Sequence, residues 1–294
     1  YHDTPDIDPV PRNKENIDEK TVEAPLFNQD SKAQEFKFLS EYNQNSNDDI
    51  VKELYQFVEK YKEWIELKRK KSIYNNLLAE NELNKCEKDY HRMKKNIGFL
   101  HSEGNENKIK VFRLMNSAMF IQLLHKEKGG KTGADLSDNK NFNYSTIKDY
   151  IFEEGKSAGW RAFQLAFILL NLDGIWQHED DDEWKYRNRV TDLVWFPTGG
   201  GKTEAYLGLI ALFILNRRME FKDAEHKGKG VTALMRYTLR LLTLQQFQRS
   251  SLLILALEKL RAENQTLLGE EPISIGLWVG SSSLPNKRSE LTTQ

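Results

Sequence analysis

Cysteine is almost absent from this sequence of 294 residues, in which Cys86 stands alone. A single cysteine excludes a disulfide within the chain and a zinc site built from its own cysteines. Long hydrophobic runs are missing as well. A membrane-spanning helix needs about 18 or more apolar residues, and the longest runs here, such as 166–170 and 252–257, are far shorter. The sequence therefore predicts no membrane span.

An excess of either charge is also lacking, because 43 Lys and Arg stand against 44 Asp and Glu. This balance excludes a globally basic coat for nucleic acid and leaves a local basic face open. Nothing that follows Tyr1 has the charged and then apolar pattern of a secretory signal. We expect a cytoplasmic protein, and we expect the chain to be a piece of a longer one.

Three regions differ in composition. Residues 1–47 are rich in Asp, Asn, Lys, Glu and Pro without an apolar period, which favours a flexible polar arm. Residues 48–144 are predicted to be a helical accessory region, because apolar residues recur there at three- and four-residue steps. The stripes are Val51, Leu54, Val58, Tyr61 and Ile65; Leu83, Cys86, Tyr90, Met93 and Ile97; and Ile109, Phe112, Met115, Met119 and Leu123.

Residues 145–294 have an α/β pattern. Helices are predicted over Trp160–Leu172, Thr203–Arg217 and Leu239–Asn264, and strands over Val190–Phe196, Val231–Tyr237 and Ile273–Val279. Strands that alternate with helices at this spacing predict a parallel sheet with helices on its faces. We therefore expect an α/β fold whose C-terminal region is the first, incomplete RecA-like lobe of a P-loop protein.

A glycine-rich segment supplies the strongest chemical signal. It lies between a predicted strand and a predicted helix and reads Pro197, Thr198, Gly199, Gly200, Gly201, Lys202, Thr203 and Glu204. In a P-loop, backbone N–H groups and a helix N-terminus hold phosphate, the lysine reaches the β/γ-phosphates and the Thr hydroxyl holds Mg²⁺. Phe196 stands where the general pattern has its first glycine, which narrows the class to helicase-type loops. The alternative is a glycine-rich turn with a chance Lys-Thr.

Arg161, Phe163 and Gln164 lie ahead of this loop. This Arg-x-Phe-Gln segment resembles the adenine-reading motif of superfamily 2 helicases. A glutamine amide offers one donor and one acceptor, which match the N6/N7 edge of adenine. The alternative is that Gln164 forms a hydrogen bond with a neighbour inside the protein.

Candidate nucleic-acid contacts follow the second and third predicted strands. Arginine, hydroxyl and amide groups at the start of a helix suit phosphate oxygens. The alternatives are an amphipathic helix that packs on the sheet, with Arg240 and Arg249 in solvent, and a plain Gly-Ser turn. The candidates are Arg236, Thr238, Arg240 and Gln246 in the first segment, and Gly280 and Ser281 in the second.

An acidic strand end after the P-loop is missing from the sequence. Such a carboxylate normally holds Mg²⁺ and orients water in a P-loop ATPase. The one candidate is the apolar run 252–257 followed by Glu258, and it lies in a stretch without Gly or Pro that favours a helix. A second motor lobe with an arginine finger is not found either. We therefore expect the chain to grip a nucleotide without completing its hydrolysis.

The runs Trp195–Gly208, Met235–Arg249 and Phe112–Met119 together resemble the DrmA family, the helicase subunits of DISARM, a bacterial defence system against phage. The resemblance covers residues 105–283. It implies an ATP-driven DNA translocase or helicase that uses Mg²⁺, acts on single-stranded or junction DNA and has the DISARM subunit DrmB as partner. It implies nucleotide contacts at Gln164, Gly199, Gly200, Gly201, Lys202 and Thr203, and DNA contacts at Arg236, Thr238 and Arg240.

Two other classes of function stay open at this point. A P-loop enzyme that acts on a small molecule, such as a kinase, would need a lid and a substrate base near the loop. A docking module would use the nucleotide site for stability and the helices of residues 48–126 as a platform for a partner. The missing acidic motif favours the docking module for the chain in isolation.

Overall fold

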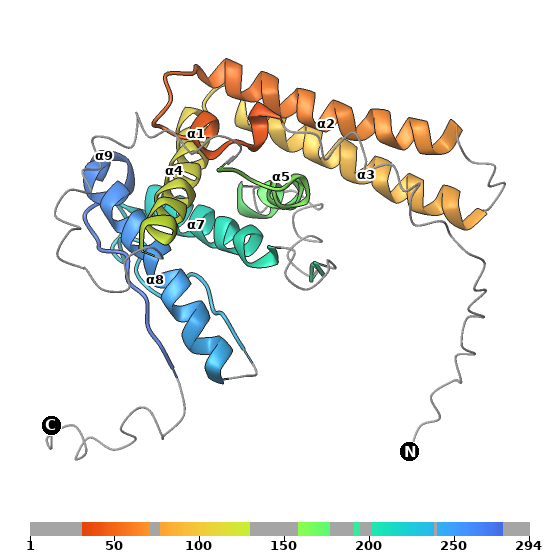
Figure 1. The fold of residues 1–294 in the computed structure, drawn as a ribbon. Helices are drawn as coiled ribbons and strands as arrows, with labels where there is room; N and C mark the ends of the chain where they lie inside the picture. Colours follow the sequence, from red (N-terminus) through yellow and green to blue (C-terminus); the bar gives the residue numbers. More distant parts are fainter. Residues whose placement is uncertain are drawn as a thin grey trace, which may run out of the picture.

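The computed structural model describes residues 31–70, 77–129, 158–176, 191–194, 201–237 and 240–278. Helices packed on one another make up the described part of the chain (Figure 1). In chain order they are the 3₁₀ helix η3 (Lys32–Gln34), α1 (Phe36–Leu39), α2 (Asn47–Lys70), α3 (Leu77–Leu100), α4 (Glu106–Gly129), α5 (Ala162–Trp176), α7 (Lys202–Phe221), α8 (Arg240–Glu263) and α9 (Gln265–Leu268).

Helices α2 and α3 lie side by side as a long hairpin along one edge of the molecule (Figure 1). Their apolar stripes form the contact, as the periodicity predicts, with Leu54 and Val58 of α2 and Met93 and Ile97 of α3 fully buried. The start of α2 is fixed by Ser46, which exchanges hydrogen bonds with Asp49. This reciprocal pair satisfies N–H groups that the first turn leaves open.

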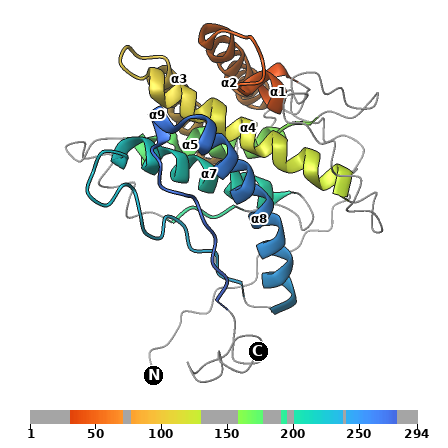
Figure 2. The ribbon, with the colours of Figure 1, turned by 90° about the vertical axis from the view of Figure 1, so that its left-hand side faces the viewer.

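Helix α4 is the centre of the packing and contacts α1, α7 and α8 (Figure 2). Apolar residues lie on several of its faces, and Val111, Phe112, Leu114, Met115 and Phe120 are all buried. A helix that is apolar on most sides is one that other helices surround. The helical region of residues 48–144 and the region that follows it therefore share one core.

Helix α5 lies between α3 and α7 and is held at both ends by tryptophan. The indole N–H of Trp160, just before α5, donates to Asn116 Oδ1 on α4 at 2.8 Å. Trp176 at the C-terminal end donates in the same way to Asn216 of α7. Both indoles are buried, so without these bonds their N–H groups would have no hydrogen-bond partner inside the protein. They fix α5 relative to α4 and α7.

Residues 31–40, which the composition assigned to a polar arm, contribute to this core. Ala33, Phe36 and Leu39 are buried, and Phe36 packs edge-on against Trp160 with ring centroids 4.7 Å apart. Glu35 forms an isolated antiparallel bridge with Gly159. A Cβ at Gly159 would lie 2.2 Å from the carbonyl oxygen of Gln34, so only glycine permits this approach. Residues 31–40 therefore pack against the residues that lead into the N-terminal end of α5.

The expectation of a RecA-like parallel sheet was wrong. The described residues of the three predicted strands, 191–194, 231–237 and 273–278, contain neither a strand nor a ladder of paired backbone groups. Figure 2 shows the segments before α8 and after α9 as plain tubes that run beside α8. Several apolar side chains of the three predicted strands are in solvent, with Leu193 82%, Val231 80% and Trp278 95% exposed, whereas Ile273 is buried.

The physical reason is that strand propensity has effect only where another strand supplies partners. The helices that were expected to cover a sheet bury their apolar faces elsewhere: α7 packs on α4 and α5, and α8 packs on α4 and α7. The helix predictions themselves are confirmed, because α5, α7 and α8 occupy the expected segments. In the part of the chain that the structure describes, no helix is long and apolar enough to span a bilayer.

Candidate nucleotide-binding site

The first turn of α7 carries Lys202 and Thr203, the two residues predicted to contact phosphate and Mg²⁺. Gly201 caps this 20-residue helix at φ +86°, a left-handed conformation that favours glycine, and forms no side-chain capping bond. Ala205, Gly208 and Leu212 on the opposite face are buried against the helices beneath. The packing therefore fixes a helix N-terminus at Gly201, and the first N–H groups of a helix, which have no partner within it, are the groups that can hold an anion.

Gln164 of α5 touches this turn directly. Its Nε2 donates to the carbonyl oxygen of Gly201 at 2.6 Å, and its Oε1 accepts the backbone N–H of Arg161 at 2.7 Å. The side chain is 4% exposed. Gln164 thus caps its own helix and holds the residue at the start of α7 with the same amide. This arrangement corresponds to the alternative weighed for Gln164, an internal hydrogen bond, and it brings the two predicted nucleotide motifs into contact.

Gly201 is closely surrounded on the side where other residues carry a Cβ. A Cβ there would lie 2.7 Å from Gln164 Nε2 and 3.9 Å from Arg161 Nε. Gly208, two turns along α7, has the same restriction, since a Cβ would lie 2.6 Å from the ring of Trp160. Glycine at both positions allows α5 and α7 to approach closely, so the contact between Gln164 and Gly201 depends on both glycines.

Two tyrosines complete the polar surroundings of Thr203. The hydroxyl of Tyr206, one turn along α7, donates to Thr203 Oγ1 at 2.9 Å. The hydroxyl of Tyr237, in the segment before α8, lies 3.4 Å from that of Tyr206. Burial raises the pKa of Tyr237, and its bond with Tyr206 raises that pKa further, so the Tyr237 hydroxyl stays protonated at neutral pH.

Glu204 is paired rather than open to a ligand. Arg249 of α8 forms a salt bridge with it, and both side chains are about one-third exposed, 32% for Arg249 and 30% for Glu204. Sequence reasoning considered Arg249 only as a solvated residue and did not consider Tyr206 or Tyr237. The spacing of three from Thr203 places Tyr206 on the same helix face, which is the one signal in the sequence that could have found it.

Glu258, considered as the missing acidic residue, has a structural role. Arg261 donates to both of its carboxylate oxygens, at 2.8 and 2.7 Å, and the backbone N–H of Ile273 donates at 2.8 Å. These bonds, that from Arg261 above all, lower the pKa of Glu258. The residue joins α8 to the segment after α9, and the helix predicted for this stretch is confirmed as α8.

The other predicted site residues are distributed unevenly. Arg161 and Arg236 are exposed and Phe163 is half-buried, whereas Gln246 is buried and so turned away from a ligand in solvent. Arg240 is the first residue of α8. The rest lie outside the described residues: Thr198, Gly199, Gly200, Thr238, Gly280 and Ser281.

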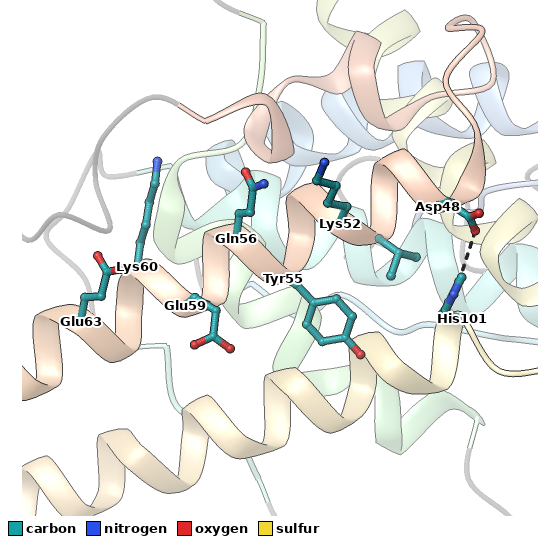
Figure 3. Close-up of a pocket in the computed structure, with 9 residues that line it drawn as sticks. Asp48, Lys52, Tyr55, Gln56, Glu59, Lys60, Glu63 and His101 are labelled. Carbon is teal, nitrogen blue, oxygen red and sulfur yellow. Dashed lines mark ion pairs between the residues drawn. The ribbon is translucent and has the colours of Figure 1, made fainter.

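A groove along α2 is separate from these residues (Figure 3). Tyr55 and Val51 form part of its floor, Glu59 and Lys60 lie along it, and His101 closes one end beside Asp48. Its three carboxylates outnumber its two lysines, so it offers no excess of positive charge to a phosphate. None of the predicted nucleotide contacts lines it.

Comparison with known proteins identifies a relative of this chain. The chain is 35% identical over 246 residues to DISARM protein DrmA of Bacillus paralicheniformis (strain ATCC 9945a / NCIMB 11709 / CD-2), a match that covers 83% of this chain. The chain is DrmA-like. The resemblance inferred from the sequence motifs is thereby confirmed. The match covers 20% of the DrmA relative, so the chain spans about a fifth of that protein's length. No protein-family model matches the chain.

Replacing Gln164 by leucine tests the contact between α5 and α7. The change leaves the Arg161 N–H and the Gly201 carbonyl without their partner, so we expect a loss of about 1–3 kcal/mol in the free energy of unfolding. Urea unfolding followed by circular dichroism measures it. Gln56→Leu, at an exposed position of α2, is the matched control. Equal losses in the two variants would contradict the structural role assigned to Gln164.

Proposed function

We propose that this chain is the nucleotide-gripping part of an ATP-dependent DNA translocase or helicase of superfamily 2 that acts in DISARM defence against phage. The observation that carries the proposal is the hydrogen bond from Gln164 to Gly201, which joins two segments 37 residues apart at one helix N-terminus. The relationship to DrmA supports the same conclusion independently.

The residues of the α7 turn fit a magnesium–nucleotide complex. The N-terminal N–H groups and the Lys202 ammonium are suited to phosphate oxygens, and the Thr203 hydroxyl is a hard oxygen ligand of the kind that Mg²⁺ prefers. ATP, when bound, supplies the phosphoanhydride bond whose cleavage drives a motor. Glu258, the one acidic candidate, is held by Arg261 and the backbone of Ile273, so we assign nucleotide binding and not hydrolysis to this chain.

The DNA part of the proposal rests on the segment before α8. Arg236 is exposed there, and its neighbour Tyr237 is in contact with Tyr206 of α7. A guanidinium at this position is suited to the sugar-phosphate backbone, which is read by charge rather than by sequence. The segment therefore combines a phosphate-binding group with a direct connection to the nucleotide site.

A second candidate function is favoured by one observation. Four large apolar side chains, Leu193, Val231, Leu234 and Trp278, are between 77% and 95% exposed. Exposed apolar residues of this size are typical of surfaces that another protein covers. In a docking module they would contact a partner such as DrmB, the subunit that the DrmA resemblance implies. Co-elution with DrmB that neither ATP nor DNA alters would favour this candidate over the motor.

Replacing Lys202 by alanine tests nucleotide binding. We expect the affinity for a fluorescent ATP analogue with Mg²⁺ to fall about tenfold or more, because a charge-assisted hydrogen bond contributes about 1.5–3 kcal/mol. Fluorescence anisotropy of the full chain measures it. Lys222→Ala, at the other end of the same helix, is the control. Wild-type protein that does not bind the analogue would remove the basis of the proposal.

Replacing Arg236 by alanine tests the DNA contact. We expect weaker binding to single-stranded oligonucleotides of any sequence and a slope of log K against log salt that is smaller by about 0.7, as for one lost phosphate contact. Lys85→Ala removes the same charge from an exposed position on α3. The DNA interface is placed wrongly if both variants have the wild-type salt slope.

A further inference from the structure

The contact between Tyr206 and Tyr237 lies between the two proposed binding functions. It joins the first turn of α7, where Thr203 lies, to the segment that carries Arg236. We propose that the Tyr206 hydroxyl couples occupation of the nucleotide site to the position of residues 231–237. This inference rests on the proposed function and names the residue that regulates it. Tyr206 is in this account a positioning residue and does not touch the reacting atoms.

The direction of the hydrogen bonds follows from counting protons. A tyrosine hydroxyl has one proton, and Tyr206 gives it to Thr203 Oγ1. Its contact with Tyr237 is therefore a bond in which Tyr237 is the donor. Because the pKa of Tyr237 is raised, that proton is retained at neutral pH. The three hydroxyls form an ordered chain that runs from Tyr237 through Tyr206 to Thr203.

A metal ion on Thr203 would act on this chain. Thr203 Oγ1 would be a poorer hydrogen-bond acceptor if it gave a lone pair to Mg²⁺, so the bond from Tyr206 would weaken. Tyr206 could then donate to Tyr237, and the contact between the two tyrosines would change. Since Tyr237 directly follows Arg236, this change would reach the residue next to the guanidinium. Linkage requires the reverse effect as well, so DNA bound at Arg236 changes the affinity for nucleotide by the same factor.

The salt bridge between Glu204 and Arg249 offers a competing route between the same elements. It joins α7 to α8, and the charge of Arg249 also acts on Tyr237. The salt bridge does not include the Thr203 oxygen, whereas the hydroxyl chain ends on it. We therefore assign the coupling to the hydroxyl chain, and we use the salt bridge as the comparison in the experiment.

The experiment measures the affinity of the full chain for a non-hydrolysable ATP analogue with Mg²⁺, with and without saturating single-stranded DNA. We expect the ratio of the two dissociation constants in the wild type to differ from one by about five- to a hundredfold. In Tyr206→Phe the ratio should fall close to one, whatever the effect on either affinity alone. Tyr237→Phe should give the same result, and the double variant should add nothing further.

Two controls separate the possible failures. Tyr90→Phe removes a hydroxyl that bonds Glu59 between α2 and α3, far from Thr203 in the bonding network, and should keep the wild-type ratio. Arg249→Met removes the salt bridge with Glu204 and should also keep the wild-type ratio of dissociation constants. Coupling that survives in Tyr206→Phe, or that is lost in Arg249→Met alone, would overturn the inference and leave the proposed function standing. Wild-type chain that binds neither ligand would overturn the proposed function and the inference with it.

Discussion

The amide of Gln164 is the constraint on which the rest of the site depends. It satisfies the N-terminus of α5 and the carbonyl of Gly201 at the same time, so two helices that are distant in the sequence start at one place. The side chain is buried, so losing these hydrogen bonds would leave an unpaired amide inside the protein and destabilise the folded state. The bond therefore fixes the left-handed Gly201, and Gly201 in turn fixes where Lys202 and Thr203 lie.

The surrounding helices make this contact possible. Trp160 anchors the start of α5 to Asn116 of α4 and packs on Gly208, where a larger residue would push α7 away. Helix α4 lies against both α7 and α8, and it belongs to the region that the sequence analysis treated as an accessory. The candidate site and the N-terminal helices therefore form one structural unit, in which the buried face of α4 supports the half-buried first turn of α7.

The sequence predicted what local patterns determine. Stripes such as Leu54 and Val58 predicted the helices, and the glycine-rich run predicted a helix start at Thr203, one residue after the observed start at Lys202. The sheet could not be predicted, because strand pairing depends on distant partners and Val231 and Trp278 lack them among the described residues. The links Tyr206–Tyr237 and Glu204–Arg249 were also missed, since each joins α7 to a residue whose position only the tertiary packing sets.

The central claim is that the first turn of α7 is the nucleotide site. Hydrogen exchange of the full chain, measured by mass spectrometry with and without an ATP analogue and Mg²⁺, tests it most directly. The account predicts slower exchange in a peptide that covers Gly201–Tyr206, with a smaller change in residues 231–237 and none along α2. Protection along the groove of Tyr55 and His101, with no change at the start of α7, would contradict it.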